Sequence, residues 1–118
     1  MKTLDLFRDE AETIAVASNE TIFLEGSEGG VMYVILEGSV KLSLSNRTLE
    51  KVGPGGFFGE MSVIDAAPRS ATATAVTACR LVPIKDSRFE ALVRESPEFA
   101  LEIMRVMARR LRSMDSRI

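Results

Sequence analysis

The chain has 118 residues and a formal net charge of −2, with 46% hydrophobic and 27% charged residues. This length and balance are typical of one folded domain and exclude a disordered chain, and the slight acidic excess argues against non-specific nucleic-acid binding by the whole surface. Histidine is absent and Cys79 is the only cysteine, which excludes an internal disulfide, catalysis by histidine and nearly every zinc or iron site, so we predict no metal.

Short runs of alternating apolar and polar residues predict strands in the first half of the chain, after a short helical segment. Residues 31–37, VMYVILE, are instead β-branched and aromatic throughout, which predicts a strand buried on both faces. The other strands are expected over residues 12–17, 21–24, 40–44 and 49–52, with a tight turn at 45–47.

The second half of the chain changes from strands to helices. Residues 53–60, GPGGFFGE, are too rich in glycine for a regular helix or a central strand. Residues 60–65 can form one or two helical turns, and the small and β-branched run that ends at Ile84 predicts one or two strands. Helices are expected over 87–94 and 97–118. Many strands followed by helices indicate a small β-sandwich or barrel with flanking helices.

No long apolar segment is present in the sequence. The longest uncharged run lies between Arg69 and Arg80, which is too short to span a bilayer, and the first ten residues lack an apolar signal core. We therefore expect a cytoplasmic protein with no membrane partner. Cys79 lies among Thr, Ala and Val residues, and we expect it to be a buried, unreactive thiol.

Three residues suggest an anion site. Gly59 comes directly before a predicted helical turn, whose free N–H groups attract phosphate, although a plain turn is the alternative. Arg69 stands among small residues and must reach solvent, bind an anion or pair with an acid such as Glu60 or Asp65. Glu60 beside a phosphate would accept a hydrogen bond from a ligand hydroxyl such as a ribose 2′-OH. Together these residues indicate a pocket for a nucleoside monophosphate.

The segment FFGEMSVIDAAPRSATATA, residues 57–75, resembles the phosphate-binding cassette of the cyclic nucleotide-binding domain family. Residues 21–42 resemble the first strands of that family. The resemblance implies a mainly β fold with flanking helices (α+β), namely a jelly roll, or double-stranded β-helix, with a short cassette helix and C-terminal helices. We expect one domain over 1–118, with a helical lead-in at 1–11, the jelly roll at 12–85 and helices at 86–118.

The resemblance also implies a role for each residue of the cassette. Glu60 would accept from the ribose 2′-OH and Arg69 would pair with the cyclic phosphate. Phe58 would line the pocket, and Arg110 would face the pocket and pair with Glu60. The backbone N–H groups of three residues and one hydroxyl would complete the phosphate cradle, namely Gly59, Met61, Ala71 and the hydroxyl of Ser70.

Other positions bear on ligand choice and on the turns. Family members that favour cGMP often carry a hydroxyl residue where this chain has Ala71, so we expect cAMP rather than cGMP. The family positions that meet the adenine amino group fall on Met114 and Asp115; Met114 suits that contact poorly, whereas Asp115 could accept from the amino group. Asn19 stands where the family often has glycine, and because asparagine tolerates the left-handed region, we expect the turn to survive.

The last predicted helix carries an apolar seam. Its members are spaced 4, 3, 4, 3 and 4 residues apart, as at the core positions of a coiled coil. We predict a parallel two-helix dimer between protomers; the alternative is a helix that packs on its own domain. The seam consists of Ala100, Met104, Met107, Leu111, Met114 and Ile118.

These observations lead to a hypothesis of function. We expect a non-enzymatic cyclic nucleotide sensor, in which cAMP in the jelly roll repositions the C-terminal helix and no catalytic cofactor takes part. The partners would be the nucleotide, a second copy of the chain and possibly another protein as output, without direct DNA binding. The alternative is a dimerisation module with a vestigial pocket. An enzyme of the cupin type would need histidines, which the chain lacks.

Overall fold

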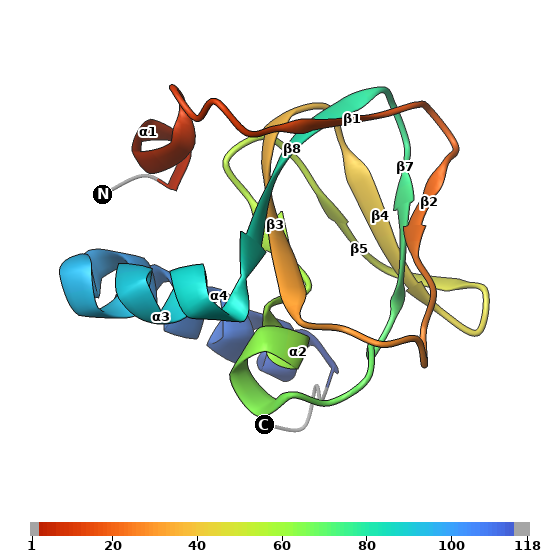
Figure 1. Ribbon diagram of the computed structural model, residues 1–118. Coiled ribbons are helices and arrows are strands. Elements are labelled where there is room, and N and C mark those ends of the chain that lie inside the picture. Colours follow the sequence, from red (N-terminus) through yellow and green to blue (C-terminus); the bar gives the residue numbers. More distant parts are fainter. Residues whose placement is uncertain (1–2, 115–118) are drawn as a thin grey trace.

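The computed structural model describes residues 3–114, and within them eight strands form two antiparallel sheets that face each other (Figure 1). This is the jelly roll that the sequence predicts. One sheet has the order β1 (Ile14–Val16), β8 (Cys79–Lys85), β3 (Val31–Glu37), β6 (Phe57–Phe58). The other has the order β2 (Thr21–Phe23), β7 (Thr72–Ala75), β4 (Val40–Leu44), β5 (Arg47–Val52).

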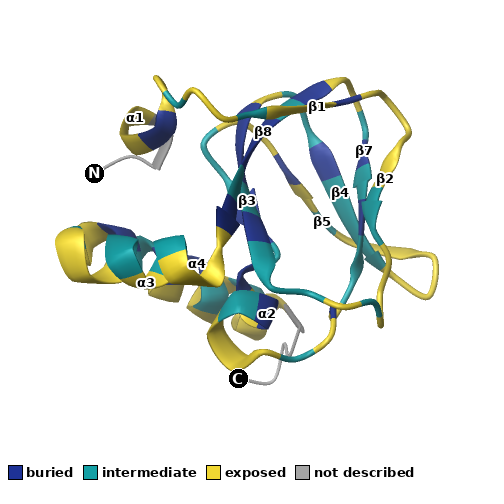
Figure 2. Ribbon diagram, viewed as in Figure 1, coloured by how far each residue is buried: buried dark blue, intermediate teal, exposed yellow. Residues whose placement is uncertain are grey.

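Strand β3 is buried on both faces, as its composition predicts. Met32, Val34 and Leu36 belong to the core that lies under the helices. Ile35 points the other way, into the core between the two sheets, where it meets Val40 and Leu81 among other residues. Successive side chains of a strand point to opposite faces, so β3 forms the wall between the two cores. Figure 2 shows the buried stretches of β3 and β8 beside the helices.

Three helices cover the outer face of this β3 sheet, and the fourth lies at one end of the sandwich (Figure 1). Phe7 and Phe89 both contact Phe99 edge-on, at 6.0 and 5.9 Å between ring centroids. Arg88 donates to Glu10 at 2.6 Å and lowers the pKa of that carboxyl. The helices are α1 (Thr3–Phe7), α2 (Glu60–Asp65), α3 (Asp86–Glu95) and α4 (Pro97–Met114).

The turns follow the sequence prediction. Asn19 has φ 71°, the left-handed conformation expected for it. Ser45 and Asn46 have φ 50° and 65° and join β4 to β5. The glycine-rich segment, residues 53–60, contains no strand other than the two-residue edge strand β6, which agrees with its exclusion from a central strand. The run that ends at Ile84 divides into β7 and β8, which lie in different sheets.

Helix α4 packs on its own domain and also leaves apolar residues exposed. Phe99, Ile103 and Val106 are buried in the core under the helices. Of the predicted seam, Met104 and Leu111 are 56% and 59% exposed. Met107 packs partly against that core, and Ala100 is half-buried. The side chain of Met114 and all of Ile118 lie outside the described residues. No helix within residues 3–114 is long and apolar enough to cross a membrane.

Candidate functional site

The cassette begins where β6 passes into α2. Gly59 caps the helix with φ 83°, a conformation that glycine adopts without strain. A Cβ atom at this position would lie 2.8 Å from Arg69 Nη1 and 3.1 Å from the carbonyl oxygen of Val31. Both the backbone angle and the space therefore require glycine. The helix starts at Glu60, as the sequence predicts.

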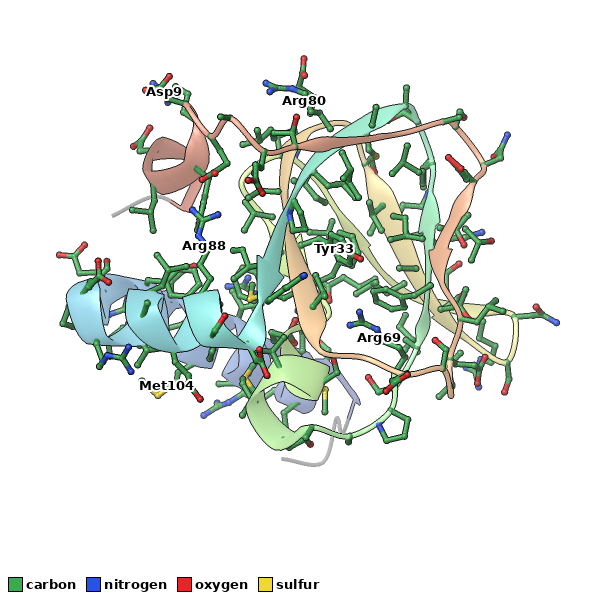
Figure 3. The ribbon with its side chains drawn as sticks, in the orientation of Figure 1. Asp9, Tyr33, Arg69, Arg80, Arg88 and Met104 are labelled. Atoms are coloured by element: carbon green, nitrogen blue, oxygen red, sulfur yellow. The ribbon has the colours of Figure 1, made fainter. Side chains whose placement is uncertain are left out.

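Arg69 is buried between the two sheets, with 7% of its surface exposed, and lies below Tyr33 in Figure 3. Its Nη1 donates to Ser62 Oγ at 2.9 Å and to the carbonyl oxygen of Gly59 at 3.3 Å. Burial lowers the pKa of the guanidinium, and Tyr33 acts in the opposite direction. Arg69 therefore enters the sandwich, where its charge is shielded from water.

Arg69 does not form the structural salt bridge with Glu60 or Asp65 that the sequence left open as an alternative. Glu60 pairs with Arg110, and Asp65 accepts a hydrogen bond from the N–H of Ala67 at 3.0 Å. Among residues 3–114, no carboxylate lies within ion-pair distance of Arg69. The cation is thus held by a hydroxyl and a carbonyl, neither of which neutralises its charge.

One edge of the Arg69 guanidinium makes no hydrogen bond to the described part of the protein. Its Nε is buried and has no hydrogen-bond partner in the described part of the chain. Nε–H and the nearer Nη2–H lie on the same edge of a guanidinium and bind two oxygens of one phosphate side by side. Because Nη1 makes the bonds to protein, this side edge matches a phosphate group. A buried unpaired donor is costly unless a ligand satisfies it.

Arg110 joins the C-terminal helix to the cassette. Its Nη1 donates to Glu60 Oε1 at 2.9 Å, which confirms the predicted pair. Its Nε donates to Glu50 Oε1 at 2.8 Å and its Nη2 to the carbonyl oxygen of Phe57 at 2.6 Å. Glu60 is 4% exposed, so this arrangement neutralises a buried carboxylate.

The remaining predicted site residues lie around this centre. Phe58 is fully buried, with its ring centroid 5.4 Å from that of Tyr33. Met61 is 45% exposed and accepts a hydrogen bond at its sulfur from the exposed Ser70 hydroxyl at 3.7 Å. Ala71 is half-buried and directly precedes β7. Asp115 and the side chain of Met114 lie outside the described residues, so adenine contact by them stays a prediction.

Sequence reasoning missed three residues of the site. Ser62 bridges Arg69 and the N–H of Gly30, which donates to its hydroxyl at 3.1 Å. The ring of Phe23 lies under the Arg69 guanidinium. Glu50 holds Arg110. A signal existed for Ser62, which lies inside the cassette segment, and a weak one for Glu50, which stands two residues before Val52 and so shares its inward face.

A scan against protein-family models matches residues 13–96 to the cyclic nucleotide-binding domain. The chain belongs to this family. It is 38% identical over 99 residues to the cyclic AMP receptor protein of Thermus thermophilus, covering 80% of this chain and 46% of that protein. It is 33% identical over 103 residues to a CRP-like cAMP-activated global transcriptional regulator of Mycobacterium tuberculosis, covering 83% of this chain and 46% of that protein.

A solved structure agrees with these relatives. The crystal structure of the Thermus thermophilus catabolite activator protein superposes with a TM-score of 0.82 at 33% identity, covering 98% of this chain and 56% of that one. The chain thus spans about half the length of the curated relatives it matches. It is a cyclic nucleotide-binding regulatory domain with the jelly-roll fold.

Proposed function

We propose that this chain is a non-enzymatic cAMP sensor of the cytoplasm, in which nucleotide binding repositions α4. The observation that carries the proposal is the buried Arg69, whose Nε has no partner among the described residues. A buried cation with an unpaired donor is costly, and an anionic ligand offsets that cost better than water does, because it supplies both charge and acceptors. Relatives named as a cAMP-activated regulator and a cyclic AMP receptor support cAMP as that ligand.

Each cassette residue has a role in this proposal. The cyclic phosphate binds the Nε–Nη2 edge of Arg69, and Glu60 accepts from the ribose 2′-OH. Phe58 lines the pocket below the ligand. The phosphate cradle is completed by the N–H groups of Gly59, Met61 and Ala71 and by the Ser70 hydroxyl. The methyl group of Ala71 offers no hydroxyl to a guanine base, which favours cAMP over cGMP.

The signal would pass from the pocket to α4 through Arg110. This side chain binds Glu60, which the ribose would also use, and the carbonyl of Phe57 next to the pocket. A ligand that changes the hydrogen bonds of Glu60 changes how firmly Arg110 holds α4. Because a ligand shifts a conformational equilibrium only through different affinities for its two states, Arg110 is where that difference would arise.

The exposed seam residues of α4 support a homodimer through this helix. Met104 and Leu111 are more than half exposed on one side of α4. A second copy or another protein would receive the movement of α4, without direct contact between this domain and DNA. The alternative function is a dimerisation module whose pocket no longer binds nucleotide, and the intact Arg69 and Glu60 argue against it.

Isothermal titration calorimetry with cAMP and cGMP tests the proposal. We expect heat of binding with both nucleotides and higher affinity for cAMP. Arg69→Lys keeps the charge but loses the paired donors, and we expect affinity to fall about 100-fold, the value of two charge-assisted hydrogen bonds. The matched control is Arg80→Lys, because Arg80 forms an exposed pair with Glu37. Absence of heat with either nucleotide would establish the vestigial module instead.

A further inference from the structure

The Arg69 guanidinium is stacked on an aromatic ring that sequence reasoning did not assign to the site. Its Cζ lies 3.9 Å from the centroid of the Phe23 ring. Phe23 ends β2, in the sheet opposite β3, and its ring also contacts the rings of Phe58 and Tyr33, with centroids 5.8 and 6.3 Å away. The Phe23 ring, packed against two other rings, is therefore the platform on which the cation lies.

The Phe23 ring offsets part of the cost of burying the Arg69 charge without a counter-ion in the described chain. Arg69 is 7% exposed, and no carboxylate in the described residues neutralises it. The face of an aromatic ring carries partial negative charge and attracts a cation, most strongly where water is excluded. Phe23 thus offers the guanidinium an attraction that does not use up any of its N–H donors.

Stacking also fixes the direction in which those donors point. The ring contacts the flat face of the guanidinium, whereas a phosphate binds at its edge, so both contacts can exist at once. Gly59 bounds the same space, since a Cβ added there would lie 2.8 Å from Nη1 and 3.4 Å from a carbon of the Phe23 ring. The guanidinium therefore occupies a narrow slot beside the ring, with Nε buried and unpaired.

We propose that Phe23 is a positioning residue for nucleotide binding, which holds Arg69 with its Nε–Nη2 edge toward the phosphate before the ligand arrives. This inference rests on the proposed function. Without the ring, the guanidinium of the free protein loses this attraction and samples other rotamers, and binding must then restore the order at a cost in affinity.

The test compares three variants by calorimetry with cAMP. Phe23→Leu removes the ring but keeps an apolar side chain, and we expect the Kd to rise about tenfold, within the range of a desolvated cation–π contact. Phe23→Tyr restores a ring, and its Kd should stay within about twofold of wild type. Phe89→Leu is the matched control, because Phe89 is also a half-buried Phe in a ring contact, with Phe99, in the other core.

Two further readouts separate positioning from loss of fold. Melting temperatures are measured for all variants without ligand. The proton shift of Arg69 Nε–H in free protein reports the ring directly: it should move downfield in Phe23→Leu and stay near wild type in Phe23→Tyr and Phe89→Leu.

The outcomes distinguish this inference from the proposed function. If wild type binds cAMP and Phe23→Leu binds within twofold of it, Phe23 does not position Arg69. An equal loss of affinity in Phe89→Leu would likewise assign the effect to general destabilisation and overturn the inference. If wild type binds no nucleotide, the proposed function itself fails, and the positioning role fails with it.

Discussion

Ala66 holds a backbone conformation that alanine rarely adopts. It ends α2 with φ 58° and ψ 19°, in the left-handed region, three residues before Arg69. An L-residue with a Cβ is disfavoured there by about 1–2 kcal/mol, whereas glycine is not. The chain thus keeps a strained residue at the bend between the cassette helix and its arginine.

We expect Ala66→Gly to stabilise the protein. Relief of the strain is partly offset by the greater freedom of glycine in the unfolded chain, so the free energy of unfolding should rise by about 0.5 kcal/mol. Urea denaturation measures it. Ala67→Gly is the control, since Ala67 is not among the residues with positive φ, and it should destabilise by a similar amount. Equal effects of the two substitutions would contradict the strain argument.

At the residue scale, the sequence predicts most of the site residues that belong to one contiguous motif, although it does not single out Ser62 within that motif. Gly59, Glu60 and Arg69 are recognisable because the residues that define their roles lie close to them in the sequence. Phe23 is not recognisable, because it lies far from Arg69 in sequence and reaches it only through the pairing of β2 with β7. Its neighbours in sequence carry no sign that a cation will lie against the ring. Roles of this kind depend on tertiary packing, which no short motif encodes.

At the element scale, one side chain ties α4 to three other elements. Arg110 binds Glu50 of β5, Glu60 of α2 and the carbonyl of Phe57 in β6. It lies also 5.3 Å from the Phe57 ring centroid. The last turns of α4 therefore depend on a charged contact as well as on the apolar face that ends with Val106 and Met107.

Glu50→Gln should loosen these last turns of α4. The substitution keeps the shape but removes the charge that faces Arg110, and because the pair is partly exposed the loss is small, about 0.5 kcal/mol. We expect amide hydrogen exchange at residues 107–113 to speed up about twofold to threefold. Glu37→Gln, in the exposed pair with Arg80, is the control and should leave those amides unchanged. Unchanged exchange in Glu50→Gln would show that Glu60 and Phe57 anchor Arg110 without the charge of Glu50.

The elements themselves were predictable to different degrees. The composition of residues 31–37 predicted β3 with both faces buried, because a strand between two cores has no polar face. The division of the later run into β7 and β8 was left open. Its small residues are compatible with either sheet. The break at residues 76–78 is what places β7 in one sheet and β8 in the other.

At the scale of the whole molecule, α4 has two apolar faces but the domain covers only one. Phe99, Ile103 and Val106 are buried, while Met104 and Leu111 remain more than half exposed, as Leu101 is in part. Exposed apolar residues that line up along a helix mark an interaction surface more often than scattered ones do. Since Met104 and Leu111 belong to the predicted seam, a second copy of α4 is the partner that the spacing favours.

Leu111→Glu should separate the proposed dimer. Placing a carboxylate from each protomer at one apolar seam opposes association through both desolvation and like-charge repulsion. In sedimentation velocity, wild type should migrate at about twice the 12.9 kDa of one chain and the variant at that of a single chain. Leu24→Glu is the matched control, because Leu24 is equally exposed, at 60%, but follows β2 rather than lying on α4. A wild-type protein that stays monomeric at 100 µM, or dissociation by the control as well, would refute the α4 dimer, and α4 would then act on a different partner.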